Sequence, residues 1–385
     1  MPDRRIHLSS FGLGFGSRLM GAQAPVLLLT GATGLVGSEL LKRLLVAKPC
    51  RPLVVLTRQR ERIPELNRIT GVVALLGDVT HPRLALDDSD YAKLQRRIVE
   101  IIHCAADTRF GLSLERSRAV NTQGTQHLLD LARRCPRVEK FAYVSTVYVA
   151  GRSTGRFLEG PLPHQNGFCN TYQQSKYEAE ELVCRAMGDL PATIFRLSSM
   201  IGDSHTGLVQ QFNYVHQLLR LFPRNPLPLA PGIPEAPIDL IATDWAIAAL
   251  AYLFESGFVS GRFYHICAGL EGSLTLREMI DLTVSIFESH PLGRRWLPMR
   301  VPELVALSRY EEFVETRRHE NDRLLNELLR VLGYFLPHLG MFQAFDNRNT
   351  MQALAPSGSQ FPPIREYYGK VVGYCLETNW GRNAT

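Results

Sequence analysis

Short apolar runs recur through the first two hundred residues of the chain, and polar segments that suit helices separate them. A run of four to eight apolar residues is typical of a strand buried on both faces of a parallel sheet. The runs lie at the beginning of 24–45 and in 52–58, 71–80, 97–107, 140–151 and 191–202. Residues 119–135 and 170–187 have helical periodicity instead. Alternating strands and helices predict an α/β fold with a doubly wound parallel (Rossmann) sheet.

This alternation ends at residue 202. Residues 221–237 are rich in proline, so we expect an irregular segment there. A helix is predicted at 243–256 and one more strand at 261–269. From 273–287 onward the pattern is mostly helical, which indicates a second, smaller structural unit.

The change of pattern suggests how the chain is divided. We expect 25–202 and 239–269 to form a dinucleotide-binding domain, and 203–238 with 270–385 to form a smaller, mostly helical substrate-binding lobe. Such a lobe would cover the carboxyl edge of the sheet, where ligands bind in this class of fold. Residues 1–24 start basic and continue with a weak apolar patch, and we expect a disordered leader.

The composition narrows the partners. The 385 residues are 45% hydrophobic and 21% charged, as in an ordinary soluble globular protein. The net charge of +6 suits an anionic ligand, but the basic residues are dispersed, so nucleic acid is not expected. Seven scattered cysteines without metal-ligand spacing predict no metal site and reduced thiols in the cytoplasm. No apolar run reaches the roughly 18–20 residues that span a bilayer, so no integral membrane segment is expected.

The stretch TGATGLVG follows the first strand directly and opens a helix. Gly31 would allow the tight turn, Gly34 would let the backbone approach a pyrophosphate, and Gly37 would let helix and strand pack closely. The free N–H groups at the start of the helix would then face the phosphates. The cofactor contacts expected from this loop are Thr30, Gly31, Thr33, Gly34, Leu35, Val36 and Gly37.

The end of the second strand indicates which dinucleotide binds. An NAD site usually has an Asp or Glu there, whereas this chain has Arg58, which can pair with the 2′-phosphate of NADP(H). The alternative is a solvated loop arginine. Asp78, after the third strand, would accept from the adenine amino group or cap the next turn. Further contacts are expected at Val79, Ala105 and Ala106.

Tyr172 and Lys176 are candidates for acid–base chemistry. Residues four apart lie on nearly one face of a helix, whereas Tyr177 is rotated by about 100° from Lys176. A nearby ammonium would lower the pKa of the phenol toward the working range, and Lys176 would also hold the nicotinamide ribose. The alternative is that Lys176 pairs with Glu180 and Tyr172 is an ordinary helix residue.

These motifs, with HCAAD, VNTQGT and YVST, occur in an order and spacing that resemble the extended short-chain dehydrogenase/reductase superfamily. Within it, TRQRER, HCAADTRF, VSTVYVAG, NTYQQSKYEAE and IFRLSSMIGD are similar to the thioester-reductase branch. That branch contains fatty acyl-CoA reductases and the terminal reductase domains of carboxylic acid reductases and nonribosomal peptide synthetases. The resemblance covers about 25–270.

The resemblance implies four catalytic residues: Thr146 as the hydroxyl partner, Tyr172 as the acid, Lys176 as its activator and Asn121 as the link to solvent. Adjacent Ser145 and Thr146 face opposite ways on a strand, and the family's spacing to the following glycine selects Thr146. Asn121 has an alternative as a helix N-cap. Leu197 stands where the family usually has proline, and Leu197, Ser198 and Ser199 are expected beside the nicotinamide.

The resemblance further implies reduction of an acyl thioester, on coenzyme A or on an acyl or peptidyl carrier protein, to an aldehyde or onward to an alcohol. Arg294, Arg295 and Arg300 would meet an acidic carrier helix or remain solvated. Residues 206–238 suit an acyl or pantetheine channel or plain interdomain packing. The alternatives are a same-fold epimerase or a hydroxysteroid- or hydroxyacyl-type dehydrogenase, and a regulator that binds NADP(H) without chemistry.

Overall fold

A computed structural model describes residues 24–47, 51–162, 166–224, 228–299, 301–317 and 336–382, together with Leu329 and Gly333. The leader expected at 1–24 lies outside these residues except for Ala24, and Arg300 lies outside them too. Within the described ranges, no helix is both long and apolar enough to cross a bilayer.

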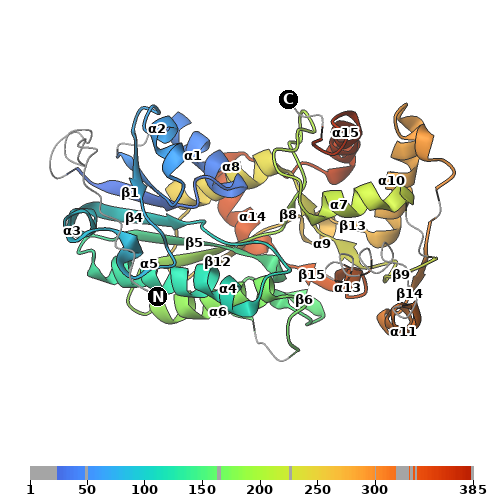
Figure 1. Cartoon of the computed structure of the whole chain (residues 1–385), viewed down its shortest axis with the longest axis horizontal. Helices are drawn as coiled ribbons and strands as arrows, with labels where there is room; N and C mark the ends of the chain where they lie inside the picture. Colours follow the sequence, from blue (N-terminus) through green and yellow to red (C-terminus); the bar gives the residue numbers. More distant parts are fainter. Residues whose placement is uncertain are drawn as a thin grey trace, which may run out of the picture.

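Seven parallel strands form the central sheet, in the order β12-β7-β5-β4-β1-β2-β3 (Figure 1). The strands are β1 (Val26–Thr30), β2 (Leu53–Thr57), β3 (Val72–Leu76), β4 (Ile98–His103), β5 (Lys140–Thr146), β7 (Ala192–Leu197) and β12 (Phe263–Ile266). Because β2 lies on one side of β1 and β4 on the other, the strand order reverses there. Ligands bind outside the carboxyl ends of strands at such a reversal. The predicted α/β fold with a doubly wound parallel sheet is confirmed.

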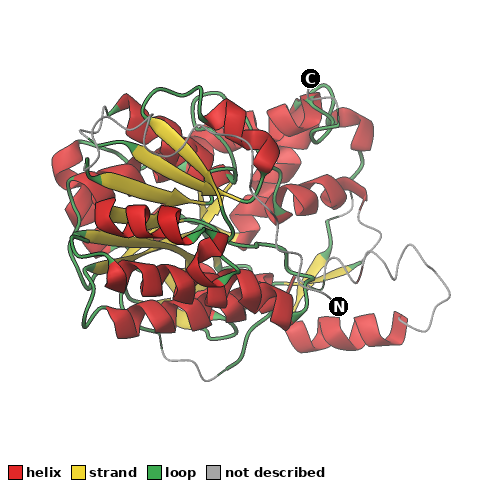
Figure 2. Cartoon of the chain, turned by 60° about the vertical axis from the view of Figure 1, so that its left-hand side comes forward, coloured by secondary structure: helices red, strands yellow, loops and turns green. Residues whose placement is uncertain are grey.

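Helices cover both faces of this sheet (Figure 2). Successive β1 side chains point to opposite faces, so Leu27 and Leu29 join one hydrophobic cluster and Val26 and Leu28 join the other. The first cluster includes α1 (Leu35–Val46) and α8 (Thr243–Glu255), and the second includes α3 (Asp88–Arg97), α5 (Gly124–Arg134) and α6 (Thr171–Ala186). Burial on both faces explains why the strands are uniformly apolar in sequence.

Other elements gather beside the carboxyl ends of the strands, as Figure 1 shows. The longer helices there are α7 (Tyr214–Leu221), α10 (Leu276–Ser289), α11 (Leu307–Arg317) and α15 (Ile364–Glu377), with α13 (Leu336–Leu339) between them. Four small strand pairs accompany them: β6 (Gly155–Phe157) with β15 (Gln343–Phe345), β8 (Ser199–Met200) with β11 (Leu240–Ile241), β14 (Glu303–Val305) with β9 (Leu229–Pro231), and β10 (Pro237–Ile238) with β13 (Leu274–Thr275). The short helices are α2 (Ile63–Leu66), α4 (Leu114–Arg118), α9 (Gly269–Gly272) and α14 (Arg348–Leu354).

Several boundaries differ from the sequence expectation. The fifth strand ends at Thr146, and a 3₁₀ turn (Val147–Ala150) follows it. Helix α10 starts at Leu276, because the Thr275 hydroxyl and the Glu278 carboxylate cap each other's backbone N–H groups. The segment expected to be irregular, 221–237, contains β9, since pairing with β14 satisfies its backbone.

Candidate active site

The glycine loop follows β1 and leads into α1, and each glycine has its own steric reason. Gly31 has φ of +75°, and a Cβ there would lie 2.6 Å from the backbone N of Ala105. A Cβ on Gly37 would collide with the backbone carbonyl of Gly31. On Gly34 a Cβ would meet only that carbonyl oxygen, at 3.5 Å, so its outer side is open. The loop therefore has a tight turn, a close helix contact and a bare backbone face, which together suit a pyrophosphate.

Two adjoining cavities lie against this loop at the carboxyl edge of the sheet. The first, of about 210 Å³, has walls that include predicted cofactor contacts: Gly31, Thr33, Gly34, Arg58, Asp78, Val79, Ala105 and Ala106. The second, of about 610 Å³, shares part of that wall and continues to Leu35, Val36, Gly37, Thr146, Tyr172, Ser198 and Ser199. We call the second one the catalytic cavity. Together the two offer one end lined by Arg58 and another lined by Tyr172, as a dinucleotide requires.

Three predicted contact residues lie behind these walls instead. The Thr30 hydroxyl is fully buried, 2.7 Å from Nδ1 of His103, and it accepts from the Ala105 N–H at 3.3 Å. It therefore ties the end of β1 to the end of β4. Leu197 is buried at the end of β7, and Lys176 is buried below the floor of the catalytic cavity. These three side chains support the cavity walls and do not line them.

The NADP(H) and adenine candidates lie at the rim. Arg58 is exposed directly after β2, where its guanidinium borders the first cavity. One carboxylate oxygen of Asp78 accepts from the Thr80 N–H at 2.9 Å. Asp78 thus forms the turn cap that its sequence context allowed, and it also lines the cavity wall.

Thr146 and Tyr172 meet at the catalytic cavity. Thr146 is the last residue of β5, and its side chain lies near the Tyr172 phenol, where it lowers the pKa of that phenol against the larger effect of burial. Its neighbour Ser145 is also buried, but within the described part of the chain the Ser145 hydroxyl has no hydrogen-bond partner and does not border the cavity. The alternation along β5 therefore separates the two hydroxyls, as expected for adjacent strand residues.

The Lys176 ammonium packs against β5. It donates to the Val144 carbonyl at 2.7 Å and lies 4.0 Å from the centroid of the Tyr143 ring. Burial lowers the pKa of Lys176 to about 7, although the Glu180 carboxylate opposes that shift. Burial also raises the pKa of Tyr172, so the expected lowering toward neutrality is wrong for this structure. The phenol is a neutral hydrogen-bond donor here.

The alternative pairing of Lys176 with Glu180 is also wrong. Glu180 binds the Arg196 guanidinium through contacts of 2.6, 3.0 and 3.1 Å, and both side chains are buried. Tyr177 packs on Phe168, with ring centroids 5.5 Å apart, outside the walls of the catalytic cavity.

Asn121 lies in a π-helical turn (Ala119–Gln123) between α4 and α5. Since the helical segment already begins at α4, Asn121 is not an N-cap. Its amide donates to the Asp107 carbonyl at 3.0 Å and to the Ser175 hydroxyl at 2.9 Å, and it accepts from the Asp107 N–H at 2.8 Å. It therefore joins the loop after β4 to the helix that carries Tyr172 and Lys176.

Four aromatic residues of the catalytic cavity were not among the predicted sites: Phe110, Tyr148, Phe212 and Tyr214. Phe110 lies 5.7 Å, between ring centroids, from both Tyr172 and Tyr214. Tyr148 follows Thr146 by two residues, within the motif VSTVYVAG. Its closeness to Thr146 in sequence could have identified it as a residue of the site. Tyr214 begins α7 and lies within residues 206–238, the segment whose composition suits an acyl or pantetheine channel or interdomain packing.

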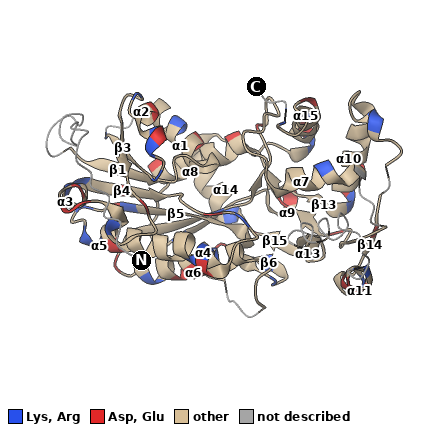
Figure 3. Cartoon of the chain, viewed as in Figure 1, with Lys and Arg blue, Asp and Glu red and all other residues tan. Residues whose placement is uncertain are grey.

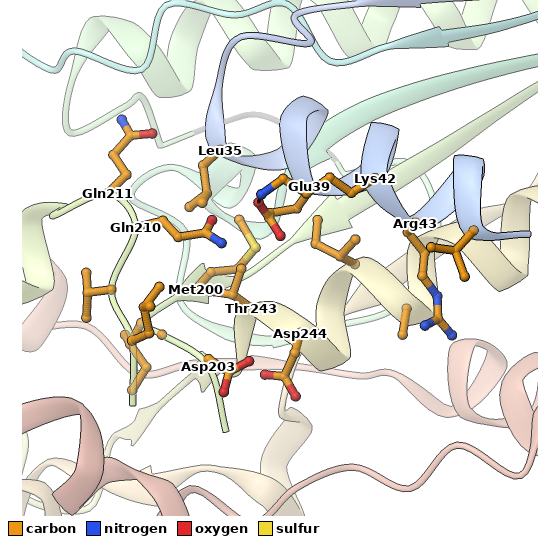
Figure 4. Close-up of a pocket in the computed structure, with 17 residues that line it drawn as sticks. Leu35, Glu39, Lys42, Arg43, Met200, Asp203, Gln210, Gln211, Thr243 and Asp244 are labelled. Carbon is orange, nitrogen blue, oxygen red and sulfur yellow. Dashed lines mark hydrogen bonds and ion pairs between the residues drawn. The ribbon is translucent and has the colours of Figure 1, made fainter. Parts of the chain in front are cut away.

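A third hollow, of about 270 Å³, lies behind residues 200–211, between α1 and α8 (Figure 4). It shares Leu35, Met200 and Gln211 with the catalytic cavity. Asp203 and Asp244 lie close together at one end of it in Figure 4. Both carboxylates accept hydrogen bonds from the loop at 204–206, so they hold that loop in place.

The comparisons with known proteins agree on the family to which the chain is similar. The profile of the family described as "Male sterility protein" matches residues 29–250. An isonitrile lipopeptide synthase from Streptomyces coeruleorubidus is 33% identical over 213 residues, which are 50% of this chain and 14% of that protein. Fatty acyl-CoA reductase 1 from Arabidopsis thaliana is 21% identical, over 81% of this chain and 80% of that protein. The chain spans about a third or less of the length of the synthases and synthetases that it matches.

Among solved structures, the terminal R domain from the myxalamid PKS-NRPS biosynthetic pathway superposes with a TM-score of 0.75 and 24% identity, covering 94% of this chain and 93% of that one. UDP-glucuronic acid 4-epimerase from Bacillus cereus, in complex with NAD, superposes with a TM-score of 0.62 and 18% identity, covering 92% of this chain and 99% of that one. At these identities the superpositions show a shared fold.

Proposed function

Since the chain belongs to the male sterility protein family, in the thioester-reductase branch of the extended short-chain dehydrogenases/reductases, we propose that it is an NADPH-dependent reductase of acyl thioesters. The observation that carries the proposal is that Thr146 and Tyr172 line the wall of the same cavity as the glycine loop. We further propose that 25–202 with 239–269 binds the cofactor and that the remaining residues after 202 bind substrate.

Several features of the cavities fit the cofactor. The bare backbone at Gly34 would receive the pyrophosphate, and Arg58 would pair with the 2′-phosphate. Ser198 and Ser199 would lie beside the nicotinamide. Bound NADPH would supply the hydride.

The residues of the chain provide the electrophilic side of the reaction. The Thr146 and Tyr172 hydroxyls would donate hydrogen bonds to the thioester carbonyl oxygen and stabilise the negative charge that develops on it. Because burial raises the pKa of Tyr172, the phenol keeps its proton until that oxygen becomes basic enough to take it. Loss of the thiol would leave an aldehyde. The aldehyde carbonyl fits the same two donors, so a second reduction would give the alcohol.

The thioester would be carried by coenzyme A or by an acyl or peptidyl carrier protein. The scattered cysteines of the sequence favour the cytoplasm as the compartment. Arg294 and Arg295 are the first two residues of a 3₁₀ turn, have exposed side chains and are candidate contacts for an acidic carrier.

The test is a substrate panel with NADPH consumption read at 340 nm, supported by chromatography of the aldehyde or alcohol. We expect turnover with acyl-coenzyme A or acyl-carrier thioesters, loss of turnover with retained NADPH binding in Tyr172→Phe, and nearly full activity in the matched control Tyr177→Phe. Turnover of a nucleotide sugar or a hydroxysteroid, with none of any thioester, would contradict the proposal. A comparable loss in both tyrosine variants would contradict the choice of Tyr172.

A further inference from the structure

The catalytic cavity adjoins an apolar corridor. A hollow of about 160 Å³ shares Tyr148 and Tyr214 with the catalytic cavity. A next hollow, of about 110 Å³, shares five residues with the first: Leu218, Phe222, Leu276, Ile280 and Leu339. We call these two hollows the apolar corridor. It leads away from Tyr172 between α7, α10 and α13, so a molecule with its reacting carbonyl at Tyr172 would extend into it.

Three hydroxyl groups surround the neck between the cavity and the corridor. The Tyr148 phenol lies 3.0 Å from the Ser199 hydroxyl and 2.7 Å from the Tyr214 phenol, and Ser199 also hydrogen-bonds with Tyr214. Burial raises the pKa of both phenols, so they remain uncharged. The hydroxyls satisfy one another, and the aromatic rings remain as walls.

Beyond the neck, the polar side chains of the wall are already engaged within the protein. The Thr283 hydroxyl bonds with the Tyr368 phenol at 2.8 Å. The Asp239 carboxylate accepts two backbone N–H groups, at 2.9 and 3.0 Å. The Gln343 amide donates to two backbone carbonyls, at 2.9 and 2.8 Å. Among the described wall residues, the exception is His338, whose Nδ1 is buried without a partner. Among the described residues, a bound molecule would therefore meet a mostly hydrocarbon surface, whose polar side chains are already bonded within the protein.

We propose that the apolar corridor binds the aliphatic chain of the thioester, and that Leu218 and Ile280, which border both of its hollows, determine the chain length accepted. This inference rests on the proposed function and makes it specific: the substrate is a fatty acyl rather than a peptidyl thioester. A peptidyl chain would bury amide groups against walls with almost no free hydrogen-bonding atom, and each unsatisfied amide costs at least about 1 kcal/mol. An alkyl chain has no hydrogen-bonding group, so its burial there carries no such free-energy cost.

The first experiment measures kcat/KM for straight-chain acyl-coenzyme A thioesters from four to sixteen carbons. Burial of one methylene is worth about 0.8 kcal/mol, so kcat/KM should rise about fourfold per added methylene until the corridor is full, and then level off. Leu218 is half-buried on α7. Leu218→Trp should therefore narrow the corridor and lower kcat/KM at least tenfold for twelve carbons, while the value for four carbons stays near that of the wild type. Leu270→Trp adds the same ring at a surface position that is 53% exposed and should change neither.

The second experiment follows displacement of a fluorescent fatty acid by dodecanoyl-coenzyme A, which requires no turnover. Leu218→Trp should weaken that displacement at least tenfold. If thioesters are reduced with no dependence on chain length, or if Leu218→Trp affects all lengths equally, the corridor assignment is overturned while the proposed function stands. If no thioester is reduced but Leu218→Trp still weakens displacement, the proposed function fails and the chain site stands. If displacement is also unaffected by Leu218→Trp, both fail.

Discussion

Glu180 on α6 and Arg196 on β7 form a buried ion pair. Neutralising one partner should lower the free energy of unfolding. Only 1% of the Arg196 side chain and 4% of the Glu180 side chain are exposed. In Glu180→Gln the guanidinium would keep its bonds to the Gly160 carbonyl at 2.9 Å and to His265 at 3.1 Å, but it would lose its counter-charge. Leaving one charge of a buried pair uncompensated costs about 3–5 kcal/mol. We expect the free energy of unfolding to fall by at least about 3 kcal/mol.

Urea unfolding at pH 7, followed by far-UV circular dichroism, measures this loss. The matched control is Asp189→Asn, which neutralises a pair with Arg133 of similar length, 2.6 Å, but with side chains 37% and 52% exposed. We expect that change to cost about 0.2–1 kcal/mol. The double variant Glu180→Gln/Arg196→Met removes both charges and should recover most of the loss. A cost below 1 kcal/mol for Glu180→Gln, or a double variant as unstable as the single one, would refute the reasoning.

Three further predictions concern the cofactor end and the buried amine. Arg58→Ala should weaken NADPH binding about 10- to 100-fold while NADH binding changes little, and Arg60→Ala should change neither; equal losses for both cofactors would contradict the 2′-phosphate contact. Gly31→Ala should abolish NADPH binding, measured by nucleotide fluorescence, in a protein that still folds, because its Cβ would collide with the Ala105 backbone and φ is +75°. Burial lowers the pKa of Lys176 from 10.5 to about 7. Between pH 7 and 10 the unfolded chain therefore binds a proton that the folded chain lacks, and the free energy of unfolding should rise with pH by up to about 1.4 kcal/mol per unit. Lys176→Met should lose that rise, and parallel stability curves for the two proteins would contradict it.

The sheet could be predicted from the sequence because it depends on local pattern. Most residues of the buried strands are apolar, and the glycine loop marks the first βα turn. The rim of the site follows from the same topology, since parallel strands bring their carboxyl ends to one edge. Hence Arg58 and Asp78, which follow the neighbouring strands β2 and β3, could be expected to line one cavity.

What the sequence could not reveal depends on contacts between distant segments. Glu180 is four residues from Lys176, yet it binds Arg196 on another element, because a guanidinium offers two donors in the right plane. The pKa of Tyr172 is governed by burial, which no local spacing encodes. Tyr214 reaches the catalytic cavity only because α7 folds back over the sheet edge.

Residues 343–354, near the end of the chain, contact elements that come much earlier in the sequence. Strand β15 pairs with β6, the Asp346 carbonyl bonds with His265 on β12 at 2.7 Å, and α14 packs near α8. A chimera that exchanges all residues after one junction between β6 and β15 would therefore separate β15 from the strand with which it pairs. Engineers who wish to graft a relative's pocket onto this scaffold must keep residues 343–354 with the host and splice at two joints.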